Sequence, residues 1–395
     1  IMHALNYINN LEMKTLFKLI LFLILTFFLA SNKILAQDKI RIGLVVPLTG
    51  EYSPIGNSII KSARLALNKI NDNRFEIIPE DSRANPIDTL RVSKKLFDQG
   101  IKIIIGPVFN ESSRYLDELK DVTFISLTNK IHGNPPNVIS AGVNAISQLK
   151  TIDKFRKLND IQRSILLIPK TDYKKEIEEA IKNTDIELKD RFFYDTDPTM
   201  LTAQIEKITR YPQRKQNLLD EIKRLENSNL IDKEKKIENL NKRDTLGGIN
   251  FDSVIIADFD ESLKSVATSL LYTDVSSKRV SYITLNQWFD NSLLKETSLH
   301  PIYFPSINQE NYKSFEEEYS ETYEMKPNQL SFLSYDIVGL VYFLIYSNDF
   351  ILDKKIFYKK NKFKGKIGIF EIDKNVITHQ LNFYSVNDQN FTKIF

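Results

Sequence analysis

The stretch from Lys39 to Asn71 constrains the fold of this chain more than any other. It opens with a nearly unbroken apolar run, Ile40–Pro47, and continues through a turn-rich loop, Leu48–Gly56. The apolar residues that follow are three or four apart, on one face of a helix: Ile60, Ala63, Leu67 and Ile70. An apolar strand followed by an amphipathic helix is typical of a parallel sheet covered by helices. Because open α/β sheets bind ligands where their strands end, we expect the loop to lie near a ligand site.

The alternation of strand and helix then continues in two series. The sequence therefore predicts an α/β fold with two Rossmann-like lobes and parallel sheets. The first series has strands at Phe75–Glu80, Ile101–Ile105 and Val122–Ser126, and the second at Ser164–Ile168, Leu188–Phe193, Ser253–Ala257 and Val280–Thr284.

A charged segment, residues 208–243, interrupts the second series. Its few apolar residues have helical spacing, and Asn227-Ser228-Asn229 divides them into two groups. This pattern predicts a helical hairpin inserted in the second lobe. One interpretation is a solvated appendage that packs on itself, and the other is an arm that binds a partner. Its opposite charges are interspersed, which does not favour nucleic acid.

Residues 1–36 have the pattern of an export signal, with the mature chain starting near Gln37. Lys14 and Lys18 form the basic end, and Leu19–Ala30 the apolar core. That core is shorter than the ~20 residues of a permanent membrane span, although an uncleaved anchor is the alternative. Translation could also start at Met13. In either case we expect a periplasmic protein.

Charge and cysteine content narrow the function classes. The net charge of +3 gives no support for nucleic-acid binding. Cysteine is absent, which excludes disulfides, thiol catalysis, thiolate metal sites and lipidation of an amino-terminal cysteine. We expect no metal and no cofactor, because the sequence has no Walker loop or dinucleotide-binding glycine pattern and its four histidines lack metal-ligand spacing.

Several motifs in this order resemble the type I periplasmic binding proteins of the leucine/isoleucine/valine-binding group. They are Ile42–Gly50, Asp81-Ser82-Arg83 with Asn85-Pro86, Ile104–Pro107, Ser334-Tyr335-Asp336, and Phe363-Lys364-Gly365 with Gly368-Ile369-Phe370. The resemblance implies two lobes, three crossovers and an interlobe cleft. It places residues 38–143 plus 307–363 in lobe 1, and residues 144–306 plus 364–395 in lobe 2.

The segment from Thr209 to Leu219, followed by Asp244–Gly248, is similar to the penicillin-binding protein activator branch of that family. Such proteins support a peptidoglycan synthase. The resemblance therefore implies a non-enzymatic activator with a synthase as partner. The alternative is the solute-binding subunit of an ABC transporter, with a permease as partner. A small polar ligand, either an amino acid or a wall fragment, is expected in the cleft.

The resemblance also implies ligand-binding positions in the first lobe. Family receptors hold the ligand carboxylate at a helix start after the Gly-Pro strand, where Asn110, Ser112 and Ser113 stand here. The alternative is a plain helix cap. Thr128 follows the next strand and could donate a hydrogen bond, whereas Lys130 replaces the family's threonine. Lys130 therefore argues against a branched-chain amino acid and favours a more anionic ligand.

In the second lobe, Tyr173 matches a tyrosine that covers the ligand, or packs on its own lobe. Asp258 follows a buried strand and either binds an ammonium group or serves the start of the next helix. We expect no catalytic residue, since there is no Gly-x-Ser-x-Gly elbow. A hydrolase that uses two carboxylates, such as Asp195 and Asp197, is the remaining enzymatic alternative.

Overall fold

A computed structural model describes residues 39–387 and 390–395. The expected export signal, residues 1–36, lies outside the described residues. Contacts group the chain into a small unit, which includes Asp72–Glu76, and a large unit, Arg41–Asn71 with Ile77–Phe395. The pocket, the helical hairpin and nearly all of both sheets lie in the large unit.

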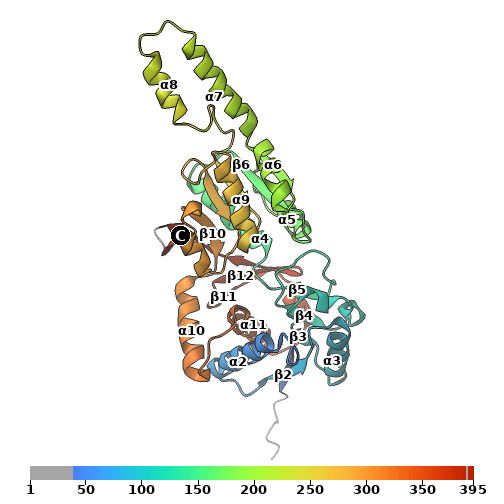
Figure 1. Cartoon of the computed structure of the whole chain (residues 1–395). Helices are drawn as coiled ribbons and strands as arrows, with labels where there is room; N and C mark the ends of the chain where they lie inside the picture. Colours follow the sequence, from blue (N-terminus) through green and yellow to red (C-terminus); the bar gives the residue numbers. More distant parts are fainter. Residues whose placement is uncertain (1–38, 388–389) are drawn as a thin grey trace, which may run out of the picture. The chain divides into compact units, whose positions relative to one another are not determined.

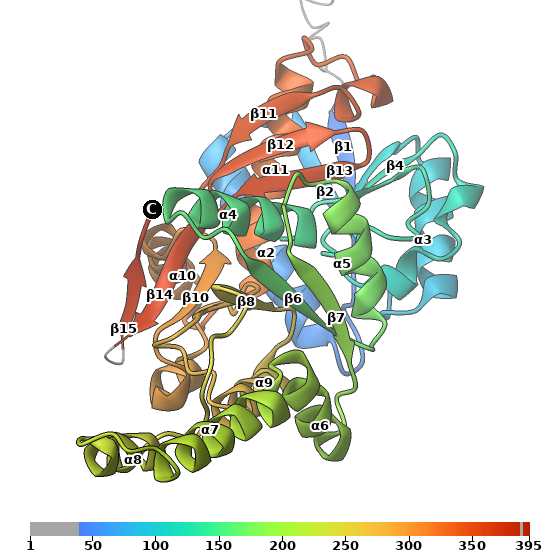
Figure 2. The ribbon, with the colours of Figure 1, turned by 90° about the horizontal axis from the view of Figure 1, so that it is seen from above.

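The first sheet has eight strands in the order β11-β12-β13-β5-β4-β3-β1-β2. Its central strands pair in parallel, whereas β11, β12 and β13 pair antiparallel (Figure 2). The strands are β1 (Ile40–Val46), β2 (Phe75–Asp81), β3 (Ile103–Ile105), β4 (Thr123–Ser126), β5 (Val138–Ser140), β11 (Asn361–Lys364), β12 (Ile369–Asp373) and β13 (Val376–Gln380).

The second sheet has seven strands in the order β15-β14-β10-β9-β8-β6-β7. It is parallel from β7 to β10, and β14 and β15 pair antiparallel at its other end. The strands are β6 (Ser164–Pro169), β7 (Asp190–Tyr194), β8 (Ser253–Ile256), β9 (Ser281–Thr284), β10 (Ile302–Ser306), β14 (Asn382–Asn387) and β15 (Asn390–Lys393).

Helices join and cover these strands (Figure 1). They begin where the sequence supplies a cap. Asn85 accepts hydrogen bonds from the backbone of Ile87 and Asp88, and Pro86 fills the first turn. The α-helices are α2 (Ser53–Ile70), α3 (Pro86–Asp98), α4 (Ala145–Leu158), α5 (Tyr173–Lys182), α6 (Pro198–Ile208), α7 (Tyr211–Glu226), α8 (Lys233–Asn241), α9 (Asp260–Tyr272), α10 (Gln309–Tyr323) and α11 (Gln329–Tyr346).

The chain passes between the two sheets three times: through α4, through α10 and α11, and between β13 and β14. The predicted α/β class with two mostly parallel sheets and three crossovers is therefore confirmed, although both sheets are mixed.

One expected boundary is wrong, because residues 364–395 do not all belong with the second half. β12 and β13 form a hairpin whose second strand pairs with β5 in the first sheet. Only after Gln380 does the chain enter the second sheet as β14. The sequence shows one extended run here, and the change of sheet within it has no local signal. The lobe limits 38–143 plus 307–363 and 144–306 remain a proposal, with 364–380 moved to the first lobe.

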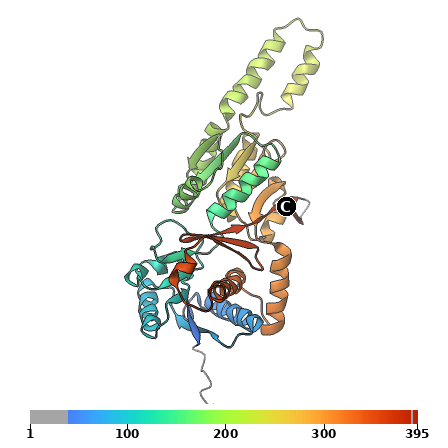
Figure 3. The ribbon, with the colours of Figure 1, turned by 180° about the vertical axis from the view of Figure 1, so that it is seen from behind.

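The predicted helical hairpin at 208–243 is present as α7 and α8, which lie side by side (Figures 1 and 3). α7 ends at Glu226, before the Asn227-Ser228-Asn229 break. Leu218 and Leu225 are buried on α7, and α8 buries no residue. The buried apolar surface of the hairpin is therefore one narrow stripe on α7.

α11 is the core helix of the first half. It begins at Gln329 and packs against α2. Among residues 39–387 and 390–395, it is the one helix long and apolar enough to cross a membrane. Two thirds of its length is buried inside the protein (67%), which is also typical of the core helix of a water-soluble protein.

Candidate functional site

A cavity of about 930 Å³ lies at the carboxyl ends of strands from both sheets. This is where open α/β sheets place their ligands. The first sheet contributes residues 108–111 after β3, 127–130 after β4 and 142–143 after β5. The second sheet contributes residues 259–260 after β8 and 286–291 after β9, and the start of α11 adds Gln329, Leu330 and Leu333.

The loops that follow strands of the first sheet form the first wall of the pocket, and the loops that follow strands of the second sheet form the second wall. Backbone contacts fix the first wall. The carbonyl of Thr128 accepts hydrogen bonds from the amide of Gly142 at 2.8 Å and the hydroxyl of Ser140 at 2.9 Å. A Cβ at position 142 would stand 2.5 Å from that carbonyl oxygen, so the two loops can approach only because residue 142 is glycine. This contact fixes the loop that carries Thr128 and Lys130.

Asn110 also belongs to this wall. Its side-chain amide donates to Asn134 Oδ1 at 2.8 Å, and the Asn134 amide donates to the carbonyl of Lys130 at 2.8 Å. The Thr128 hydroxyl oxygen accepts from the Lys130 amide at 3.2 Å. Within the described residues, the Lys130 ammonium group and the Asn129 amide have no partner, so both are available to a ligand.

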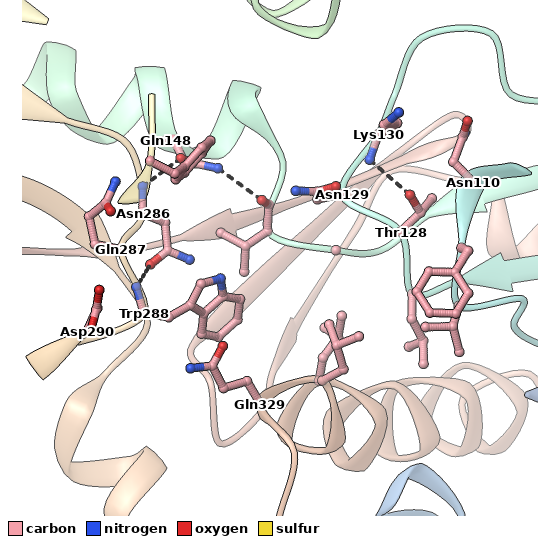
Figure 4. Close-up of a pocket in the computed structure, with 18 of the residues that line it drawn as sticks. Asn110, Thr128, Asn129, Lys130, Gln148, Asn286, Gln287, Trp288, Asp290 and Gln329 are labelled. Atoms are coloured by element: carbon pink, nitrogen blue, oxygen red, sulfur yellow. Dashed lines mark hydrogen bonds between the residues drawn. The ribbon is translucent and has the colours of Figure 1, made fainter. Parts of the chain in front are cut away.

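Gln148 and Asn286 join the two walls. Gln148 on α4 donates to the carbonyl of Val143 at 3.0 Å and accepts from the amide of Asn286 at 2.8 Å (Figure 4). Asn286 accepts in turn from the amide of Trp288 at 3.0 Å and from the hydroxyl of Ser306 at 2.8 Å. These bonds fix the loop after β9.

The loop after β9 presents the chain's single tryptophan. Trp288 and Phe289 both have left-handed backbone angles, with φ of 48° and 58°. Such angles are uncommon for bulky residues and typical of functional loops. In Figure 4 the Trp288 ring and the Gln329 amide point toward the same part of the pocket. Together they offer an aromatic face and an amide to a polar ligand.

The expected site residues divide into two groups. Asn110 and Thr128 both line the large pocket. Ser112 and Ser113 do not: their hydroxyl groups are buried, with no hydrogen-bond partner in the described residues. They lie in η1 (Asn110–Ser113), a short 3-10 helix in place of the longer helix expected there.

Tyr173 and Asp258 do not line the pocket. The Tyr173 ring packs against Phe259, 5.8 Å between centroids, and burial raises the pKa of its hydroxyl. The Asp258 carboxylate accepts from Tyr194, from the hydroxyl of Ser262 at 2.5 Å, and from the amide of Phe259. Burial beside this carboxylate raises the pKa of Tyr194. Asp258 therefore has structural partners here, and its ligand role stays a prediction.

Sequence reasoning missed Gln148, Asn286, Trp288 and Gln329. Their position after a strand could have identified Asn286 and Trp288. Asn286 and Trp288 follow the buried strand β9, so the rule that ligands bind where strands end applies to them as it does to Thr128. Gln148 and Gln329 lie in the first turns of helices, and no local pattern distinguishes them from other polar residues.

Comparison with known proteins agrees with this geometry. Residues 39–209 match the sequence profile of the periplasmic binding protein family. The structure superposes on bilobed proteins of this kind over 90% of the chain. The chain has the type I periplasmic binding protein fold. The resemblance found in the sequence is thereby confirmed at the level of the fold, and the family match covers residues 39–209.

Three solved structures illustrate the range of proteins with this periplasmic binding protein fold. The branched-chain amino acid substrate-binding protein LivJ from Streptococcus pneumoniae, in complex with isoleucine, has 16% identity and a TM-score of 0.52, over 90% of this chain and 100% of that chain. A branched-chain amino acid ABC transporter ligand-binding protein from Burkholderia xenovorans has 9% identity and a TM-score of 0.63, over 90% and 95%.

The third is the C-domain of LpoA from Haemophilus influenzae, a regulator of PBP1A. It has 12% identity and a TM-score of 0.56, over 90% of this chain and 100% of that chain. At these identities the likeness concerns the fold alone. No curated protein sequence matches the chain. The matched family model and the first two structures are of binding proteins, and the third is of a regulator.

The described residues contain no candidate metal site. Within the described residues, no group of three or more histidine, aspartate or glutamate side chains is placed to hold a metal ion. Two acidic residues of the pocket have partners within the protein. Glu111 pairs with Arg114, and Asp290 caps the next short helix through the amide of Ser292 at 2.8 Å.

Proposed function

We propose that this chain is a non-enzymatic periplasmic binding protein that activates a peptidoglycan synthase, a penicillin-binding protein activator. The observation that carries the proposal is the α7–α8 hairpin. It adds two helices to the second half of the fold, and α8 buries none of its residues. Apolar side chains on the hairpin remain exposed: Leu219, Leu230 and Ile231.

Such a surface suits contact with another protein. Ile231 lies between the two helices and is fully exposed, and Leu230 beside it is 43% exposed. Contiguous exposed apolar side chains, such as those of Leu230 and Ile231, mark interaction sites. The resemblance of the segment before Leu219 to the activator branch, and the shared fold with a PBP1A regulator, support the same proposal.

The pocket supports a small ligand that modulates this activity. Amide side chains dominate its polar lining, among them Asn129, Gln287 and Gln329, and Trp288 adds an aromatic face. Amides and aromatic rings suit a polar ligand with sugar or peptide groups, and the Lys130 ammonium group suits an acidic group on that ligand. We therefore propose a wall fragment as the ligand, rather than a branched-chain amino acid.

The alternative function is solute binding for an ABC transporter. The family match over residues 39–209 and the shared fold with LivJ favour it. On that alternative the hairpin is an appendage that packs on itself, and the pocket carries an amino acid to a permease.

The test replaces the exposed hairpin residues by Leu219→Ser, Leu230→Ser and Ile231→Ser together. Full-length protein is added to a purified peptidoglycan synthase from the same cells, and the rate of glycan polymerisation is measured. We expect the wild type to raise the rate and the triple variant to lose most of the increase. Substitutions of exposed residues leave stability nearly unchanged.

The matched control is Ile87→Ser, Leu158→Ser and Met325→Ser, three exposed apolar residues outside the hairpin. This variant should stimulate the synthase as the wild type does. If the wild type has no effect on the synthase and binds an amino acid, the transporter alternative replaces the proposal.

A further inference from the structure

A lysine-rich surface in the first half of the fold is used neither by the pocket nor by the hairpin. Residues 354–366 span η5 (Lys354–Phe357) and β11 and contain no aspartate or glutamate. All seven of their charged residues are lysines: Lys354, Lys355, Lys359, Lys360, Lys362, Lys364 and Lys366.

Three of these lysines have carboxylate partners. Lys354 pairs with Asp121 at 3.1 Å, Lys362 pairs with Glu371 at 2.7 Å, and Lys366 pairs with Glu318. The other four are exposed, and within the described part of the chain no carboxylate pairs with them: Lys355, Lys359, Lys360 and Lys364. Clustered like charges of this kind create a strong local positive potential.

Exposed apolar side chains adjoin these lysines in the chain. Ile351 is 64% exposed and Tyr346, at the end of α11, is 57% exposed. The Tyr346 ring packs against Phe350, 5.6 Å between centroids, which holds it at the surface. We call the six residues the basic patch: Tyr346, Ile351, Lys355, Lys359, Lys360 and Lys364.

Two carboxylates lie near the basic patch in sequence, Asp349 and Asp353. The Asp353 carboxylate accepts a hydrogen bond from the amide of Lys355 at 2.9 Å, so it caps η5. Residues 349–366 then hold seven lysines and two aspartates, a net charge of 7 − 2 = +5, which exceeds the +3 of the whole chain. The positive charge of the protein is therefore concentrated here.

Tyr346, Ile351 and η5 lie at the end of α11 opposite to the pocket, and Lys364 ends the outer strand β11. α11 begins at Gln329, which lines the pocket, and ends at Tyr346 in the patch. Its 18 residues correspond to a length of ~27 Å. Lys354 contacts Asp121, just before β4 starts, whereas the pocket residues follow the end of β4. A partner bound at the patch would therefore leave the pocket open.

We propose that the basic patch docks on the surface of a bilayer that contains anionic phospholipids. The four lysines bind the lipid phosphates, and Ile351 and Tyr346 enter the headgroup region. Lysines with adjacent aromatic and aliphatic residues are the usual composition of such surfaces. A soluble polyanion would satisfy the lysines but would give the exposed isoleucine no apolar surroundings. This inference does not depend on the proposed function.

The test is co-sedimentation of the full-length protein with vesicles of phosphatidylglycerol and phosphatidylcholine, compared with pure phosphatidylcholine. The variant carries Lys355→Gln, Lys359→Gln, Lys360→Gln and Lys364→Gln. A single lysine near an anionic membrane strengthens binding about fivefold. We expect the variant to lose at least about tenfold in affinity for the anionic vesicles, and wild-type binding to weaken as salt rises.

The matched control makes the same charge change elsewhere, with Lys215→Gln, Lys223→Gln, Lys235→Gln and Lys278→Gln. These four lysines are also exposed. The control should bind within about twofold of the wild type, since it leaves the patch intact. Any contribution of the apolar stretch Leu19–Ala30 is common to all variants, so the differences between variants report the patch.

A single substitution, Ile351→Ser, separates a membrane from a soluble polyanion. It should weaken binding to anionic vesicles and leave binding to inorganic polyphosphate unchanged. Equal losses in the patch variant and the control would overturn the proposal, as would vesicle binding that is insensitive to both Ile351→Ser and salt. Ile351→Ser and the salt series also test it if the four-lysine variant does not fold.

Discussion

The environment of Asp336 strongly affects the charge of its carboxyl group. It is buried in α11, and its carboxylate accepts hydrogen bonds from the amides of Lys366 at 2.8 Å and Ile367 at 2.6 Å. Burial outweighs these bonds and raises its pKa to about 7. A Cβ at Gly365 would stand 2.3 Å from Asp336 Oδ2, so glycine is required for this approach.

This raised pKa predicts a pH dependence of stability. Between its unfolded pKa, about 4, and the folded value of about 7, the folded state binds more protons than the unfolded state. The contribution of Asp336 to the free energy of unfolding is therefore fully present below pH ~4 and is lost as pH rises toward its folded pKa.

Asp336→Asn should remove this pH dependence. We expect the free energy of unfolding of the variant, relative to the wild type, to rise between pH 5 and pH 7.5, by on the order of 1 to 3 kcal/mol. Urea unfolding at the two pH values measures it. The exposed Asp349→Asn is the control. A difference between variant and wild type that stays constant with pH would contradict the assignment.

At the scale of elements, the α7–α8 hairpin is anchored by one buried arginine. Arg214 on α7 donates to the carbonyl of Thr209 at 3.0 Å, to the hydroxyl of Thr245 at 3.0 Å and to the carbonyl of Thr273. Burial lowers its pKa, and the carboxylate of Asp274, 3.8 Å away, opposes that effect. The residue thus joins α7 to the loops that precede β8 and follow α9.

Arg214→Gln should destabilise the protein because the acceptors that Arg214 contacts lose their hydrogen-bond donor. Two carbonyls and a hydroxyl lose a donor in a buried site, and we expect a loss of about 2–4 kcal/mol in the free energy of unfolding. Arg224→Gln, on the same helix but in an exposed pair with Glu221, should cost no more than about 1 kcal/mol. Denaturant unfolding compares the two.

Hydrogen exchange gives a second measurement for the hairpin. In Arg214→Gln the amides of α7 should lose protection before those of β8, because α7 loses its attachment first. Equal stabilities for the Arg214 and Arg224 variants would show that the hairpin is held by its apolar stripe alone.

At the scale of the whole molecule, the pocket depends on both sheets. Thr128 comes from the first sheet and Trp288 from the second, and Gln148 bonds to a segment of each. A ligand that contacts both walls should favour arrangements in which they are close, as in hinged binding proteins. Binding should then appear as a stabilisation of the whole folded state.

Thermal unfolding with muropeptides tests the pocket directly. The melting temperature should rise with ligand concentration, and at 100 times Kd the stabilisation should be about 2.7 kcal/mol. Trp288→Ala should weaken the affinity roughly tenfold, because the aromatic face is lost. Tyr115→Ala, an exposed aromatic outside the pocket, is the control.

The outcome with amino acids decides between the two proposed functions. A concentration-dependent shift with leucine or isoleucine and none with muropeptides would favour the transporter alternative. A shift that Trp288→Ala leaves unchanged would place the ligand elsewhere in the molecule.

Much of the fold could be predicted because its signals are local. The apolar run Ile42–Val46 became the buried strand β1, and the Asn85-Pro86 pair became the start of α3. The Asn227-Ser228-Asn229 break became the turn between α7 and α8. Each signal depends on residues within one or two turns of chain, where periodicity, capping and turn chemistry act.

The amino-acid sequence by itself determined the α/β class, the two series of strands and the hairpin. The family resemblance pointed to Asn110 and Thr128, which both line the pocket, and their ligand role stays a prediction. Only the tertiary structure decided that Ser112 and Ser113 point inward, that β13 joins the first sheet, and that Gln148, Trp288 and Gln329 complete the pocket. The physical reason is distance along the chain. Thr128 and Trp288 are brought to one pocket by packing between segments far apart in sequence, which no local pattern specifies.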